Sequence, residues 1–169
     1  MAVEYVDIPV EDIGIFLIKD SDKSFMKAMV KYFVDNKLSY KIKSCANEMY
    51  RIYLFIKKSK EAMIINVNES TSGSMHIQLR IKNPSVFEKL GDYTKNVRNS
   101  ILNGKTCKAP YCCNCNSEYV FTYKETEYRK CHMLCDNFQI RNLDIDDYQN
   151  LFTIIQDEIK FGKPKGRKS

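Results

Sequence analysis

The chain has 169 residues, of which 44% are hydrophobic and 28% are charged, an ordinary composition for a folded protein that excludes general disorder. Residues 160–169 carry five of the 27 basic residues and none of the 21 acidic ones, so the remaining chain is almost neutral despite the net charge of +6. This balance argues against a broad phosphate-binding surface. The chain has no signal-peptide pattern and no apolar run of about 18 residues, so we expect a cytoplasmic protein without membrane contact.

The first 36 residues combine two short apolar runs with one helical pattern. Val3–Val6 and Ile13–Ile18 are typical of short strands. From Asp20 onward, apolar residues recur at helical spacing as far as Asn36. The sequence therefore predicts two short strands and then a surface helix capped by Asp20 or Ser21.

Four strand-like segments with short connections follow this helix. The second is apolar on both faces, as in a strand covered on both sides, and the fourth alternates apolar with polar residues, as in a half-buried antiparallel strand. The pattern predicts an antiparallel meander. The four segments are residues 40–42, 50–56, 63–67 and 75–81.

A second helical region begins at Asn83-Pro84, where a capping residue precedes a proline that suits the first helical position. Its apolar face extends to Ile101, and Asn103-Gly104 provides the stop signal. Gly91-Asp92 can divide the region into two shorter helices.

Six of the seven cysteines lie between Cys107 and Cys135. Cys112 and Cys115 form a C-x2-C pair, fifteen residues follow, and Cys131 and Cys135 form a C-x3-C pair. Two such pairs at this spacing are typical of a structural zinc site. We predict these four cysteines as zinc ligands.

Other ligand sets remain open. Cys113 or Cys107 could replace Cys112, and His132 could replace Cys131. The same cysteines could also be buried free thiols, ligands of an iron–sulfur cluster, or disulfide partners. An odd cysteine count in a reducing compartment favours metal binding over disulfides.

Between the two cysteine pairs, residues 119–123 and 127–130 have strand character and flank a turn at residues 124–126. A knuckle, a hairpin and a second knuckle resemble the generic zinc-ribbon architecture over residues 107–135. This resemblance implies a cysteine-rich module held by metal.

The last helix is predicted to begin after Asp144, with Asp146 and Asp147 in its first turn, where the helix dipole favours acidic residues. Its apolar stripe should dock on the core. The residues after Phe161 are basic and hydrophilic and predict a flexible tail. The predicted organisation is a core domain (1–104), a cysteine-rich zinc-ribbon-like module (105–140), a docking helix (141–160) and a basic tail (161–169).

The fourth strand places His76, Gln78 and Arg80 on one face. They could line a binding wall for an acidic small molecule. An ordinary solvated sheet face has the same pattern and is the simpler interpretation.

The hairpin could present an aromatic surface to single-stranded bases. Packing of the same aromatic face against the core is the simpler alternative, because an isolated hairpin is only marginally stable. The residues concerned are Tyr119, Phe121, Tyr123, Arg129 and Lys130.

The sequence therefore predicts an α+β fold: an antiparallel β-meander packed with helices, a zinc-ribbon-like hairpin module and a C-terminal helix. A non-enzymatic binding or regulatory protein with structural zinc is the favoured function. The alternatives are a nucleic-acid-binding protein that uses the hairpin and the basic tail, and an enzyme acting on a small acidic substrate near His76 and Arg80. Catalysis has little support, because Cys131 and His132 are sequence neighbours that face apart and no catalytic motif is present. Neither the partner nor the oligomeric state is predicted.

Overall fold

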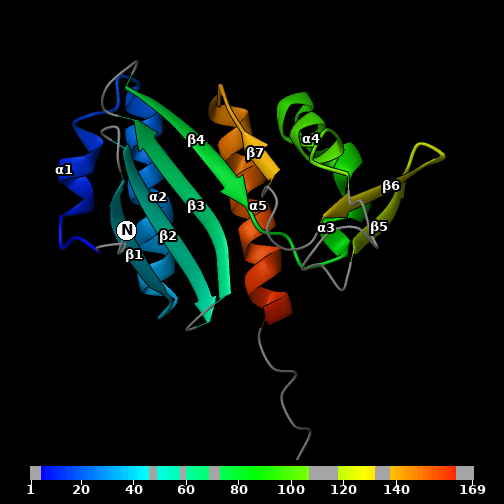
Figure 1. Cartoon of the computed structure of the whole chain (residues 1–169), viewed down its shortest axis with the longest axis horizontal. Helices are drawn as coiled ribbons and strands as arrows, with labels where there is room; N and C mark the ends of the chain where they lie inside the picture. The colour runs from blue at the N-terminus through cyan, green and yellow to red at the C-terminus, as the bar shows by residue number, and fades with distance from the viewer. Residues whose placement is uncertain are drawn as a thin grey trace, which may run out of the picture.

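The computed structural model describes residues 5–45, 49–57, 60–68, 73–106, 118–131 and 138–162. It is an α+β fold with a five-stranded sheet, in the order β1-β2-β3-β4-β7, and a separate hairpin of β5 and β6 (Figure 1). The strands are β1 Ser39–Cys45, β2 Met49–Lys57, β3 Lys60–Asn68, β4 Ser74–Leu79, β5 Glu118–Tyr123, β6 Thr126–Cys131 and β7 Phe138–Ile140. The helices are α1 Val10–Gly14, α2 Asp20–Asp35, α3 Ser85–Glu88, the short 3-10 helix η1 Leu90–Asp92, α4 Lys95–Leu102 and α5 Ile145–Gly162.

Strands β1 to β4 form the predicted antiparallel meander. The predicted features of two strands are confirmed, because Ile52 to Ile56 are all buried on β2 and burial alternates along β4. The fifth strand was not predicted. β7 pairs with β4 through Leu79 and Phe138, so the end of the range 105–140 belongs to the core sheet.

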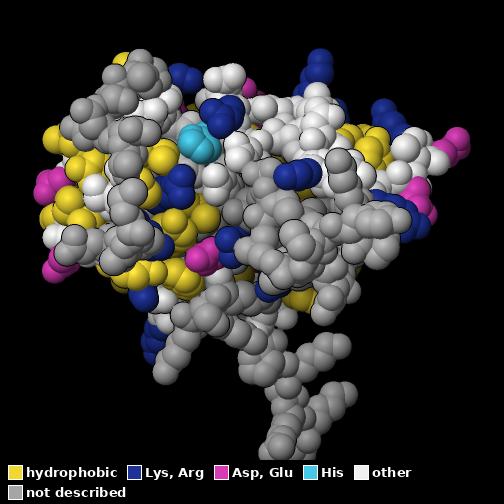
Figure 2. Space-filling view, viewed as in Figure 1, with side chains coloured by type: hydrophobic (Ala, Val, Ile, Leu, Met, Phe, Trp, Pro, Cys, Tyr) yellow, Lys and Arg dark blue, Asp and Glu magenta, His cyan; other side chains and the backbone are white. Residues whose placement is uncertain are grey.

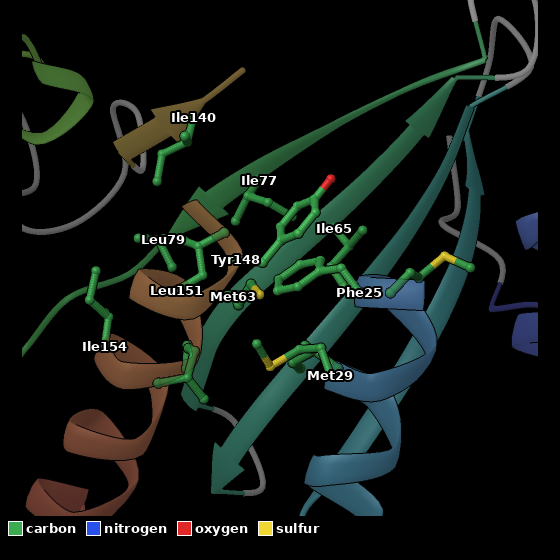
Figure 3. Packing of buried hydrophobic residues seen from close by; sticks show 14 of the residues in the cluster. Phe25, Met29, Met63, Ile65, Ile77, Leu79, Ile140, Tyr148, Leu151 and Ile154 are labelled. Carbon is green, nitrogen blue, oxygen red and sulfur yellow. The ribbon is translucent and has the colours of Figure 1, made fainter. Parts of the chain in front are cut away.

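Both long helices, α2 and α5, lie on the same face of the sheet (Figure 1). The core fills the space between them and the strands. Figure 3 shows Phe25 and Met29 of α2 directed toward Met63 of β3, with Tyr148 and Leu151 of α5 beside them. Among the described residues, no long helix lies on the opposite face of the sheet, which we call the helix-free face.

The start of the chain differs from the sequence prediction. Residues 13–18 do not form a strand, because Val10–Gly14 is a short helix that begins after Pro9. Val10 and Ile13 are both buried, which is the spacing of one helical face. The predicted helix α2 is confirmed, but the predicted caps are wrong: Lys19 occupies the N-cap position and makes no side-chain capping bond.

The second helical region is divided as predicted, with η1 between α3 and α4. Thr94 caps α4, since its Oγ1 accepts a hydrogen bond from the backbone N of Val97 at 3.3 Å. Asp144 caps α5, since its Oδ1 accepts from the backbone N of Asp147 at 3.2 Å. α5 ends at Gly162, which is buried, so the docking helix is slightly longer than predicted.

A buried hydrogen bond joins the two long helices. Tyr148 of α5 donates its phenolic proton to the carboxylate of Asp22 on α2, and both residues are buried. Burial, and then this hydrogen bond, raises the pKa of Tyr148 above its ordinary value. The bond therefore joins α2 and α5 near their N-terminal ends, since Asp22 and Tyr148 lie in the first turns of these helices.

We predict that Tyr148→Phe lowers the free energy of unfolding by about 1.5–3 kcal/mol, because it leaves a buried carboxylate without this donor. Urea denaturation followed by circular dichroism measures the change. The matched control is Tyr40→Phe, since Tyr40 is 37% exposed and its substitution should change stability by less than about 0.5 kcal/mol. Equal effects of the two substitutions would show that the helix–helix bond contributes nothing.

Candidate functional site

The predicted hairpin is confirmed. β5 and β6 pair in antiparallel register and are joined by Lys124 and Glu125, whose φ values of 47° and 66° both lie in the left-handed region. Two consecutive residues of this conformation form the tight turn that matches the twist of a hairpin. The turn is the distal end of the hairpin.

The opposite end of the hairpin joins the segments that carry the cysteines. Glu118 pairs with Cys131 across the two strands, and Thr106 pairs with Lys130 on the other edge of β6. Residues 106 and 118, which flank the first cysteine-bearing segment, therefore lie on opposite sides of β6. Residue 118 lies next to Cys131, at which β6 ends.

Lys130 ties this end of the hairpin to the core. Its ammonium Nζ donates to the carbonyl oxygen of Gly104 at 2.7 Å, and the residue is only 5% exposed. Burial lowers the pKa of Lys130 below its ordinary value. Gly104 also lies close to the ring of Phe138, where a Cβ atom would come within 2.6 Å. Residues 106, 118, 131 and 138, which flank the two cysteine-bearing segments, are thus all held around Gly104 and Lys130.

Three of the four predicted ligands, Cys112, Cys115 and Cys135, lie outside the described residues, as do the alternates Cys107, Cys113 and His132. Cys131 ends β6, but the structure does not describe its side chain. The described residues contain no group of three or more His, Cys, Asp or Glu side chains that could hold a metal ion. The zinc ligands therefore remain a prediction.

The aromatic face of the hairpin packs against the protein. Phe121 stacks on Phe87 of α3 with ring centroids 4.4 Å apart, and Tyr128 stacks on Phe121 at 5.4 Å. Tyr123 also packs against the core, and Arg129 pairs with the Glu127 carboxylate at 3.0 Å. The side chain of Tyr119 is not described. The rings of Phe121 and Tyr128 are therefore engaged in packing.

The helix-free face of the sheet carries the predicted wall of His76, Gln78 and Arg80. The structure pairs Arg80 with Glu61, whose carboxylate lies 2.7 Å from the guanidinium, so this cation is neutralised. His76 has different neighbours, because its strand partner is Asn66 of β3.

A row of polar and basic residues crosses this face through His76. In strand register it runs from Lys43 on β1 to Arg51 on β2, Asn66 on β3 and His76 on β4, and Arg141 follows directly after β7. We call these five residues the cation row. Figure 2 views this face and shows basic side chains beside histidine and beside hydrophobic residues. Sequence reasoning found only His76, because the other four residues come together only through strand pairing.

The centre of the cation row contains buried polar groups whose hydrogen bonds are not satisfied. Asn66 is 0% exposed, and neither its amide nitrogen nor its amide oxygen has a hydrogen-bond partner among the described residues. The guanidinium Nε of Arg51 is also buried without a partner. Each such group costs about 1–3 kcal/mol of stability. A folded protein seldom retains such groups without a compensating role.

The pKa of His76 is lowered to about 4. Burial is the main cause, and the positive charges of Arg141 and Arg51 add to it. The imidazole is therefore neutral at neutral pH, and one of its nitrogens can accept while the other donates.

A second polar region lies between α4, β7 and the start of α5, where a cavity of about 1140 Å³ is lined by Asn96, Asn99 and Asp147 among others. Asp147 is fully buried, but its carboxylate accepts hydrogen bonds from Asn96 and from the Thr94 hydroxyl. These polar groups cap helices and join them through hydrogen bonds. The polar lining of the cavity therefore has a structural role.

Comparisons with protein-family models, with curated proteins and with solved structures find no match to this chain. Within the described part of the chain, no helix combines the length and the apolar character needed to cross a membrane. Function therefore has to be inferred from the residues and their geometry.

We predict that Asn66→Val raises the free energy of unfolding by about 1–3 kcal/mol, because it removes two buried polar groups that have no partner. Asn68→Val is the matched control on the same strand, because Asn68 is half-buried and has an interaction partner, so its substitution should not raise stability. Urea denaturation measures both variants. A loss of stability in Asn66→Val would contradict the description of this amide.

We also predict a pH dependence that His76 causes. Its pKa is about 4 in the folded protein and 6.5 ordinarily, so the unfolded chain takes up the proton at a higher pH. The contribution of neutral His76 to the free energy of unfolding is therefore complete above pH 6.5 and is lost as the pH falls from 6.5 toward 4. After allowance for solvent screening, the loss is about 1–2 kcal/mol. The measurement is the difference in unfolding free energy between the wild type and His76→Gln at each pH, and a difference that does not vary with pH would refute the prediction.

Proposed function

We propose that this protein is a non-enzymatic binding protein in which a structural zinc ion holds the cysteine-rich segment and the helix-free sheet face carries the ligand-binding surface. The supporting observation for zinc is the double pairing of β6, with Glu118 opposite Cys131 and Thr106 opposite Lys130. This pairing brings together the ends of both segments in which the cysteines lie.

Chain length supports the proposed ligand set. Cys115 is three residues from Glu118, and three residues of chain span at most about 11 Å. Cys135 is four residues from Cys131, a reach of at most about 14 Å. Thiols on such short tethers can meet in a tetrahedron beside the end of β6. Cys112, Cys115, Cys131 and Cys135 would provide four thiolates, which is a closed structural site without an open position for catalysis.

A hairpin needs such support. Two strands alone are marginally stable, and Phe121 stacking on Phe87 is one of the contacts that hold this hairpin to the core. Zinc would add an attachment at the end of the strands where Lys130 donates to the Gly104 carbonyl. Thiolate ligands require a reducing environment, so a cytoplasmic location belongs to the same proposal.

Nucleic-acid binding through the hairpin has less support. Phe121 and Tyr128 are stacked in packing contacts and Arg129 is paired with Glu127. Base-stacking surfaces need rings that are free to receive a base. Residues 163–169 of the basic tail lie outside the described residues.

We predict that the purified protein contains about one zinc ion per chain and that Cys135→Ser loses it. Metal binding in such sites is coupled to folding, so this variant should also become sensitive to proteases within residues 107–140. Elemental analysis and limited proteolysis are the measurements.

Two control variants sharpen this test. Cys107→Ser removes a thiol outside the preferred ligand set and should retain the zinc. Cys45→Ser removes the half-buried free thiol of β1, far along the chain from the cysteine-rich segment, and should also retain it. An empty site in Cys107→Ser together with a full site in Cys135→Ser would overturn the ligand assignment.

A further inference from the structure

We propose that the cation row binds the phosphate groups of a small ligand, such as a phosphomonoester or a diphosphate. This inference deepens the proposed function, on which it rests, by naming the chemistry that the helix-free sheet face recognises. The residues involved are Lys43, Arg51, Asn66, His76 and Arg141.

The charge on this face is one-sided. Lys43, Arg51 and Arg141 each carry one positive charge, and no described residue of the cation row is acidic. The next row along the strands contains Lys41, Tyr53, Ile64, Gln78 and Gln139, which also lack a carboxylate. Among the described residues, the nearest acid along β3 is Glu61, and Arg80 already neutralises it. Counted over the described residues, the row therefore holds an excess of positive charge that an anion would balance.

The floor of the row supplies directional hydrogen bonds. In the part of the chain that the structure describes, the amide nitrogen of Asn66 and the Nε of Arg51 are buried donors without partners. Buried polar groups are normally satisfied, and a ligand that accepts from both would remove their desolvation cost. Arginine is well suited to this role, because its planar guanidinium donates two parallel hydrogen bonds to phosphate oxygens.

The geometry favours phosphate over a single carboxylate. Neighbouring strands lie about 4.8 Å apart, so the backbones of Arg51 on β2 and His76 on β4 are about 10 Å apart, with Asn66 between them. Hydrogen-bond donors on three neighbouring strands could therefore approach one ligand. A tetrahedral phosphate has oxygens directed toward several sides, whereas a carboxylate has only two oxygens in one plane. The full row covers four strands and the residue after β7, which leaves room for a second phosphate group.

Of the aromatic residues beside the cation row, Tyr53 and Phe55 are not free to recognise a base, whereas Tyr5, which bridges to Lys43 at the sheet edge, is 50% exposed. Tyr53 is 9% exposed and Phe55 is 7% exposed, and the two rings stack on each other with centroids 6.4 Å apart. The ammonium of Lys43 lies 4.8 Å from the centre of the Tyr53 ring. Single-stranded nucleic acid usually requires accessible rings beside the cations. One exposed ring at the edge of the row offers little stacking surface for successive bases, so a compact phosphate ligand is favoured over a nucleic acid.

The test is titration of the zinc-loaded full chain with inorganic phosphate, with pyrophosphate and with a short single-stranded oligothymidylate, each followed by calorimetry. We expect pyrophosphate to bind more tightly than phosphate, and Arg51→Gln and His76→Gln each to weaken pyrophosphate at least about tenfold, the effect of losing one charge-assisted hydrogen bond. Asn66→Val should weaken binding as well, although it makes the fold more stable. That combination separates a binding residue from a structural one.

Lys27→Gln is the control, because it removes the same charge from an exposed position on α2, which covers the opposite face of the sheet. It should change pyrophosphate affinity less than twofold. The imidazole resonance of His76, assigned with His76→Gln, should shift on pyrophosphate addition in the wild type.

Three results would overturn the inference: no binding of either phosphate compound, an equal loss of affinity in Lys27→Gln and Arg51→Gln, or tight binding of oligothymidylate with no binding of pyrophosphate. Zinc content is measured on the same samples. Absence of phosphate binding in a protein that retains its zinc would reject the phosphate site alone, whereas absence of zinc would reject the proposed structural metal.

Discussion

The packing of both long helices on one face of the sheet is the constraint on which the rest of the structure depends. α2 and α5 bury the apolar side of strands β1 to β4 and β7, and the bond between Tyr148 and Asp22 holds the helices together. A strand directs alternate residues to opposite faces, so the remaining residues of each strand must lie on the helix-free face. The character of that face follows from what these alternate positions contain.

The helix-free face has two parts with different physical roles. Tyr53, Phe55 and Ile64 form a small buried apolar cluster that stabilises β2 and β3. Beside it, Arg51 and Asn66 bury polar groups that have no partner and therefore reduce stability. The proposed binding site would account for this cost, because functional surfaces commonly retain groups that the folded state alone would not select.

The hairpin depends on attachments at different points along its strands. Phe121 packs on Phe87, and Lys130 donates to the Gly104 carbonyl near the end where the cysteine-bearing segments leave. A zinc site at that end would join the hairpin to the edge of the sheet, since β7 follows the second segment within a few residues. The proposed metal and the proposed phosphate site would then support each other only indirectly, through the common sheet.

Long periodic segments could be predicted from the sequence alone. The helical stripe of α2, the alternation along β4, the two-strand hairpin and the Asp144 cap of α5 all follow from local spacing and local hydrogen bonding, and the structure contains each of them. The zinc ligands also rest on local spacing, but they lie outside the described residues apart from the backbone of Cys131.

Only the tertiary structure decided the short elements and the composition of the cation row. β7 has three residues, too few to show a period, and it becomes a strand because the β4 edge offers hydrogen-bonding partners. The strand predicted for residues 13–18 overlaps the end of α1 and is wrong, because a short apolar run fits either state until its burial is known. Arg51 and Arg141 are 90 residues apart in the sequence, and both act on His76 because strand pairing places them across one sheet. Local sequence specifies which way a residue points along its strand, whereas the register between distant strands determines its neighbours.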